Sequence, residues 1–234
     1  MNRTKIEWTD YTWNPITGCL HNCPYCYARR MAYRLRGRYG YPKEDPFKPT
    51  FHEDRLTEPC QIKTPSKIFT VSMGDMFGSW VPRHWVDKIL GIMWTCHHWR
   101  HGHVFQVLTK APQNVNVLVE QFPPNLWLGV TVESPNAEWR MNFLDTTLRK
   151  KGLKVAWVSL EPLHGPVMLR EGLDWVVIGA ETGNRRGKKV PEKWWIEAIL
   201  KQAEGLGIPV FMKDNLYPYW KEPLLQEFPE VVIP

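Results

Sequence analysis

The stretch Val155-Ala156-Trp157-Val158-Ser159-Leu160-Glu161-Pro162 places a short, continuous apolar run directly before a carboxylate and a proline. We expect a buried strand over Val155–Ser159, because short continuous apolar runs are typical of strands in a parallel sheet covered by helices. Six further segments have the same character: Thr12–Thr17, Lys67–Ser72, Val104–Leu108, Leu126–Thr131, Trp175–Ile178 and Pro209–Met212.

Helical segments are expected between these strands, at Tyr27–Arg36, His84–His97, Val115–Gln121, Ala137–Leu148 and Lys193–Gly205. Strands that alternate with helices predict an α/β fold with a parallel sheet and outer helices. Six or seven such units, without a recognisable eighth, predict an incomplete barrel. We expect one domain over residues 1–234, with a proline-rich excursion at about residues 40–66 that acts as a lid or contacts substrate.

Polar residues follow six of the predicted strands. The carboxyl ends of parallel strands meet at the mouth of a barrel, so these residues are expected to face a common polar cavity. Ordinary strand-end turns and helix caps account for some of them. Those that we take as candidates for substrate binding or proton transfer are Lys110, Glu161, Glu181, Lys213 and Asp214.

Three cysteines near the start of the chain, Cys19, Cys23 and Cys26, have the spacing C-x3-C-x2-C. Thiolates are soft ligands that select zinc, copper(I) or iron–sulfur clusters, and three of them on a [4Fe–4S] cube leave one iron open. A Cys3His zinc site with His21 is an alternative, although zinc ligands usually come as two separated pairs. A non-catalytic zinc or iron–sulfur binding module therefore stays open.

The cysteine spacing, with Tyr25 directly before the last cysteine, resembles the radical SAM superfamily. The resemblance implies a partial TIM-type (β/α)6 barrel, with Cys19, Cys23 and Cys26 as ligands of a [4Fe–4S] cluster. It also implies S-adenosylmethionine (AdoMet) at the open iron and an external electron donor. Reductive cleavage of AdoMet would give methionine and a 5′-deoxyadenosyl radical that abstracts hydrogen from the substrate.

The same resemblance implies positions that contact AdoMet. Met73-Gly74-Asp75, after Ser72, stands where the superfamily has a Gly-Gly-Glu stretch that binds the amino group. Here methionine replaces the first glycine and aspartate replaces glutamate. Thr131, Glu133 and Ser134 resemble ribose-contacting positions, Tyr25 corresponds to an aromatic residue near the adenine, and Ser159 lies where the adenine is steadied.

Four further segments look like a radical SAM branch found in phages and prophages, the three-Cys-motif radical SAM-like proteins. They are Thr12–Cys19, Phe51–Leu56, Ser159–Pro162 and Gly179–Gly183, and the resemblance spans nearly the whole chain. In that branch a "three-Cys-motif partner" protein is often encoded nearby. The resemblance thus implies a protein partner.

The chain carries a net charge of +6, with a pI of about 9.0. This balance favours an anionic partner, and we expect radical modification or repair of nucleic acid or a nucleotide. A peptide or partner protein as substrate is the alternative. The cations cluster in two runs, each of which is equally explained as a solvated face: Arg29, Arg30, Arg34, Arg36 and Arg38, and Arg185, Arg186, Lys188 and Lys189.

No apolar run approaches the roughly 20 residues that cross a bilayer, and the first residues lack the apolar core of a secretion signal. We therefore expect a cytoplasmic protein without membrane contact. Cys60 and Cys96 are the two cysteines outside the loop, too few for a secreted disulfide framework. We expect ordinary buried thiols, with hydrogen-atom donation to a substrate radical as the alternative.

Overall fold

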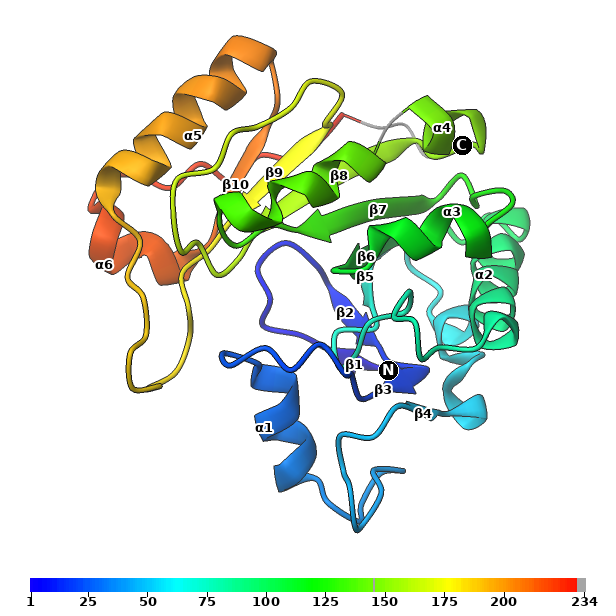
Figure 1. Cartoon of the computed structure of the whole chain (residues 1–234). Coiled ribbons are helices and arrows are strands. Elements are labelled where there is room, and N and C mark those ends of the chain that lie inside the picture. The colour runs from blue at the N-terminus through cyan, green and yellow to red at the C-terminus, as the bar shows by residue number, and fades with distance from the viewer. Residues whose placement is uncertain (145, 231–234) are drawn as a thin grey trace.

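A computed structural model of the chain describes residues 1–144 and 146–230. Its main sheet has the strand order β1-β2-β5-β6-β7-β8-β9-β10 (Figure 1). Neighbouring strands from β2 to β10 are parallel, and β1 pairs antiparallel with β2. The bounds are β1 Asn2–Arg3, β2 Tyr11–Trp13, β5 Lys67–Thr70, β6 Val104–Thr109, β7 Leu126–Thr131, β8 Val155–Leu160, β9 Trp175–Ile178 and β10 Val210–Met212. The predicted α/β class and partial barrel are confirmed.

Helices cover the outer face of this sheet. In α2 (Arg83–His98) the buried residues Val86, Ile89, Leu90 and Met93 recur at helical spacing and join the main core. In α5 (Lys193–Leu206) the buried residues are Ile196, Ile199 and Ala203. The remaining α-helices are α1 Tyr27–Arg34 and three shorter ones, α3 Val115–Leu118, α4 Thr146–Lys150 and α6 Tyr217–Trp220. The 3-10 helices are η1 Glu53–Arg55, η2 Glu58–Gln61, η3 Pro112–Asn114, η4 Pro135–Phe143 and η5 Asp214–Leu216.

The inner face of the sheet carries a second, aromatic core. Trp8 packs there against Trp157 and Trp175, with ring centroids 5.4 and 6.1 Å apart. Gly129 leaves room for this packing, because a Cβ atom at that position would lie 2.5 Å from the Trp157 ring. Alternate residues of the central strands β7, β8 and β9 therefore enter the outer and the inner core. This explains why these strands are continuous apolar runs rather than alternating ones.

Two element predictions were wrong. Thr12–Thr17 is not one strand: β2 ends at Trp13, and β3 (Ile16–Thr17) pairs antiparallel with β4 (Thr50–Phe51) in a separate sheet. Pro15 lacks an N–H for ladder pairing and breaks the run. Ala137–Leu148 is not one α-helix, because η4 is a 3-10 helix and α4 starts at Thr146. The spacing of its buried residues does not distinguish the two helix types, and the intervening residue 145 lies outside the described residues.

The other predicted helices differ from the structure at their ends. The segment expected at Val115–Gln121 is shorter, because Val119 is already extended after α3. Tyr27–Arg36 also ends earlier, at Arg34. Helix ends depend on local backbone bonds that an apolar pattern does not encode.

The proline-rich segment, residues 40–66, packs against residues 13–17, which lead into the cysteine loop. β4 pairs with β3, the Trp13 Nε1–H donates to the carbonyl of Arg55 at 2.8 Å, and Thr17 Oγ1 lies 2.8 Å from His52 Nε2. Phe47 is the one described residue of this segment that lines the cavity introduced below. The segment is therefore mainly a support for the strand that leads into the loop.

None of the helices in the described part of the chain combines the length and the apolar character that a bilayer crossing needs.

The buried His52 makes stability depend on pH. Burial, and then the charge of Arg55, lower the pKa of His52 from 6.5 to about 4. Between these two values only the unfolded chain binds the proton, so the free energy of unfolding falls as the pH drops from 6.5 to 4, by on the order of 3 kcal/mol. The variant His52→Gln has no group that titrates at this position, so we expect its free energy of unfolding to lack this decrease between pH 6.5 and 4. Urea unfolding of both proteins across this range checks it, and equal slopes would contradict it.

Candidate functional site

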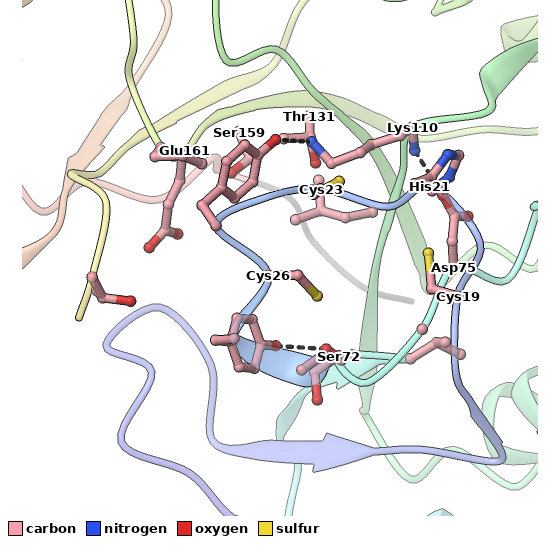
Figure 2. Close-up of a pocket in the computed structure, with 18 of the residues that line it drawn as sticks. Cys19, His21, Cys23, Cys26, Ser72, Asp75, Lys110, Thr131, Ser159 and Glu161 are labelled. Carbon is pink, nitrogen blue, oxygen red and sulfur yellow. Dashed lines mark hydrogen bonds and ion pairs between the residues drawn. The ribbon is translucent and has the colours of Figure 1, made fainter. Parts of the chain in front are cut away.

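A cavity of about 340 Å³ lies at the carboxyl ends of the parallel strands. The cysteine loop forms one wall, and polar residues that follow the strands form the other (Figure 2). Its floor is the aromatic inner core, represented by Trp8 and Phe69. The predicted site residues that line it are Cys19, Cys23, Tyr25, Cys26, Ser72, Gly74, Asp75, Lys110, Thr131, Ser159, Glu161, Glu181 and Lys213.

The cysteine loop is fastened to the end of β5 through two glycines. Gly18 has a φ of +88°, and a Cβ atom there would lie 2.3 Å from the carbonyl oxygen of Lys48. Its N–H donates to the carbonyl of Met73 at 2.9 Å, and Gly18 forms a parallel bridge with Gly74. A side chain at either position would push the loop away, so the close approach requires glycine.

The three thiols project from this loop toward the same space (Figure 2). Burial raises the pKa of Cys19 to about 12. Burial also raises the pKa of Cys23, although the positive charge of Lys110 opposes the shift. Cys26 is at the N-cap of α1, where its Sγ accepts the Arg29 N–H at 3.3 Å. Buried thiolates without a cation are unfavourable, so this wall of the cavity favours a positively charged ligand for the sulfurs.

Asp75 is the most highly connected acid of the site. Its carboxylate accepts hydrogen bonds from the Thr109 hydroxyl, with the two oxygens 2.8 Å apart, and from the backbone N–H groups of Lys110 and Phe77, at N···O distances of 2.9 and 3.0 Å. His21 Nε2 lies 2.7 Å from Oδ2. Burial alone would raise the pKa of Asp75, but these bonds, first the one with His21, lower it below its usual value. The ionised carboxylate thus joins the cysteine loop to the ends of β5 and β6.

A second network surrounds Tyr25. Its hydroxyl donates to Glu133 Oε1 at 3.1 Å and accepts from Lys110 Nζ at 2.9 Å. Glu133 Oε2 also forms ion pairs with Arg140 Nη1 at 2.7 Å and with Lys110 Nζ at 3.2 Å. Burial opposes ionisation of Glu133, but the charges of Lys110 and Arg140 hold its pKa below the usual value. Burial, with the charge of Glu133, raises the pKa of Tyr25, so its phenol stays neutral.

Two ion-paired groups occupy the opposite side. Lys213 Nζ lies 2.6 Å from Glu161 and 3.8 Å from Glu7. Burial lowers the pKa of Lys213, but the charge of Glu161 more than offsets this and raises it. Glu181 pairs with Arg185 at 2.7 Å and with His164 at 3.0 Å. The arrangement therefore provides an ammonium and two carboxylates at fixed positions beside the thiol wall.

The structure places four predicted site residues outside the cavity lining. Met73 is buried with α1 residues, and Glu133 reaches the site only through Tyr25 and Lys110. Ser134 precedes η4 and lines a separate depression. Asp214 is exposed and accepts Gln226 Nε2 at 3.1 Å.

Several contributors were not among the predicted site residues, or were considered for another role. His21 and Arg140 each complete a network, whereas Glu7, Trp8 and Phe47 come from segments far from the predicted strand ends. His21 stood out by its place between the cysteines and was considered as a zinc ligand, whereas the structure pairs it with Asp75. Cys60 and Cys96 do not line the cavity; their sulfurs lie 3.6 Å apart, between η2 and α2.

Comparison of the fold identifies a similar class of structure, the partial α/β barrel of spore photoproduct lyase. Its complex with dinucleoside spore photoproduct superposes with a TM-score of 0.55 at 11% identity, over 88% of this chain and 64% of the lyase chain. A single-residue variant of the lyase gives a TM-score of 0.61 at 10% identity, over 90% of this chain and 78% of the lyase chain. A double variant with bound AdoMet and dinucleoside spore photoproduct gives a TM-score of 0.54 at 12% identity, over 90% of this chain and 57% of the lyase chain.

The chain spans about 64% of the length of the first of these lyase structures. At such identities the likeness shows the fold. By sequence, the chain belongs to the family described as "Protein of unknown function (DUF5131)", which matches residues 3–222. The curated proteins contain no match to it.

Asp75 is expected to hold the site together, and Asp214 provides a matched control at another strand end. Asp75→Ala leaves four buried or half-buried donors without their acceptor, so the free energy of unfolding should fall by about 3 kcal/mol. Asp214→Ala removes an exposed carboxylate and should change it by less than about 0.5 kcal/mol. Denaturant unfolding measures both values; equal losses would show that Asp75 is not the anchor.

Proposed function

We propose that this protein is a radical SAM enzyme that acts on nucleic acid or a nucleotide. The observation that carries the proposal is the meeting of the C-x3-C-x2-C thiols with charged strand-end residues at one cavity of a partial parallel barrel. The fold likeness to spore photoproduct lyase, one of whose structures contains AdoMet and dinucleoside spore photoproduct, supports it.

The residues present fit an iron–sulfur cluster. Within residues 1–144 and 146–230, no three His, Cys, Asp or Glu side chains gather closely enough to hold one metal ion. A [4Fe–4S] cube takes one thiolate at each iron, so its ligands bind at separate corners rather than at one point. His21, the alternative fourth ligand, already has its Nε2 beside Asp75. Cys19, Cys23 and Cys26 would thus hold the cluster and leave one iron open.

The chain's own residues would position the cofactor and substrate. With an external electron donor, the bound cluster would supply the electron that cleaves AdoMet to methionine and a 5′-deoxyadenosyl radical. Ser72, Gly74, Thr131 and Ser159 line the cavity and are proposed as direct AdoMet contacts. Asp75 and Glu133 would act through the groups they hold, His21 and Tyr25. Lys110, Glu161, Glu181 and Lys213 are the groups available to bind substrate or move a proton.

The chemistry at the cluster can be tested with Cys23→Ala and the matched control Cys60→Ala. After anaerobic reconstitution with iron and sulfide, the unmodified chain and Cys60→Ala should each carry about four irons and release methionine and 5′-deoxyadenosine when reduced. Cys23→Ala lacks one of three ligands and should lose this cleavage entirely. Tightly held zinc, or cleavage that survives in Cys23→Ala, would contradict the proposal.

The substrate class is tested separately by anaerobic incubation of the reconstituted enzyme with cellular or phage nucleic acid. We expect at least one nucleoside of changed mass that depends on AdoMet and on Cys23. Mass spectrometry of the digested nucleosides measures this. Unchanged nucleosides, with AdoMet cleavage coupled to a modified protein, would favour a peptide or protein substrate instead.

A further inference from the structure

We infer that two distant basic segments form one surface that binds the backbone of a single-stranded nucleic acid beside the cavity mouth. We call this surface the basic rim; it consists of Arg30, Arg34, Arg36, Arg186, Lys188 and Lys189. The inference rests on the proposed function, because it specifies the form of nucleic acid that this site receives. It assigns no role in the chemistry.

The first observation is that the two segments meet at the edge of the cavity. Tyr27 and Ala28, at the start of α1, line the cavity, and so do Glu181 and Thr182, at the start of the loop between β9 and α5. The Arg30 guanidinium lies against Gly183, where an added Cβ would be 2.8 Å from Nη1. Segments about 150 residues apart in the sequence thus meet beside the same cavity.

The second observation is the charge of these segments. Residues 27–39 and 182–190 contain nine arginines and lysines and no aspartate or glutamate. Arg185 is neutralised by Glu181, but within the described residues none of the six rim side chains has an acidic partner in ion-pair range. Five of the six are exposed and Lys188 is half-buried. Unpaired cations at one place attract a polyanion and release its counterions.

The third observation favours a single strand over a duplex. Tyr33 and Tyr39 lie among the rim arginines and are 50% and 73% exposed. The Arg36 guanidinium is 5.3 Å from the centre of the Tyr33 ring. Exposed aromatic rings interleaved with cations are the pattern that binds unpaired bases by stacking and phosphates by charge. Base faces in a duplex are not available for such stacking.

The charge contribution is tested with Arg34→Gln/Arg186→Gln/Lys189→Gln against Arg100→Gln/Lys154→Gln/Arg170→Gln. Both triple variants remove the same charge from exposed positions. Fluorescence anisotropy with labelled DNA and RNA single strands should show at least about tenfold weaker binding for the rim variant. Its log–log salt slope should be smaller by about 2, since a single strand contributes about 0.7 per phosphate contact. The control variant should match the unmodified chain.

The stacking contribution is tested with Tyr33→Ala/Tyr39→Asn; asparagine suits the positive φ of residue 39, which is 51°. This variant should bind single strands about tenfold more weakly with an unchanged salt slope. The inference is overturned if the unmodified chain binds no single strand, binds duplex equally well, or if both triple variants weaken binding equally. If nucleosides are modified but the chain does not bind single strands, the basic rim is wrong and the proposed function stands. If the chain binds single strands but does not cleave AdoMet, the proposed function is wrong and the rim stands.

Discussion

The site depends on one buried carboxylate, that of Asp75. It follows β5, faces the cysteine loop and is 4% exposed. An ionised group this deep is unfavourable unless donors surround it, and four donors from three separate segments do so. These bonds fix the distance between the loop and the strand ends. Together with the backbone contacts of Gly18 at Met73 and Gly74, they hold the cysteine loop at the ends of β5 and β6.

The two cores of the sheet provide the rigid base that such bonds require. The outer core joins the strands to α2 and α5, and the inner core fills the barrel with tryptophan rings below the cavity. Close packing on both faces leaves the strands little freedom to shift. Polar groups at their ends are therefore held at fixed positions, and such fixed positions are what electrostatic binding of a cofactor or substrate needs.

Charges inside the cavity are largely balanced within the site, whereas those at its edge are not. Lys213 faces Glu161, Lys110 faces Glu133, and Glu181 faces Arg185. The cations of the basic rim, in residues 27–39 and 182–190, have no acidic residue within those two segments. A ligand inside meets paired groups that orient it, and a polyanion outside meets an excess of positive charge. The two regions thus suit different tasks.

Most of the strands, the parallel class and the grouping of the three cysteines could be predicted from the sequence, because periodicity and local spacing encode them. Thirteen of the seventeen predicted site residues line one cavity, since the ends of parallel strands converge. The folded chain, and not the sequence pattern, shows that donors enclose Asp75, that Asp214 is exposed, and that Arg30 meets Gly183. Asp75 and Thr109, like Arg30 and Gly183, are far apart in the sequence, and no local pattern specifies which side chains meet when the chain folds.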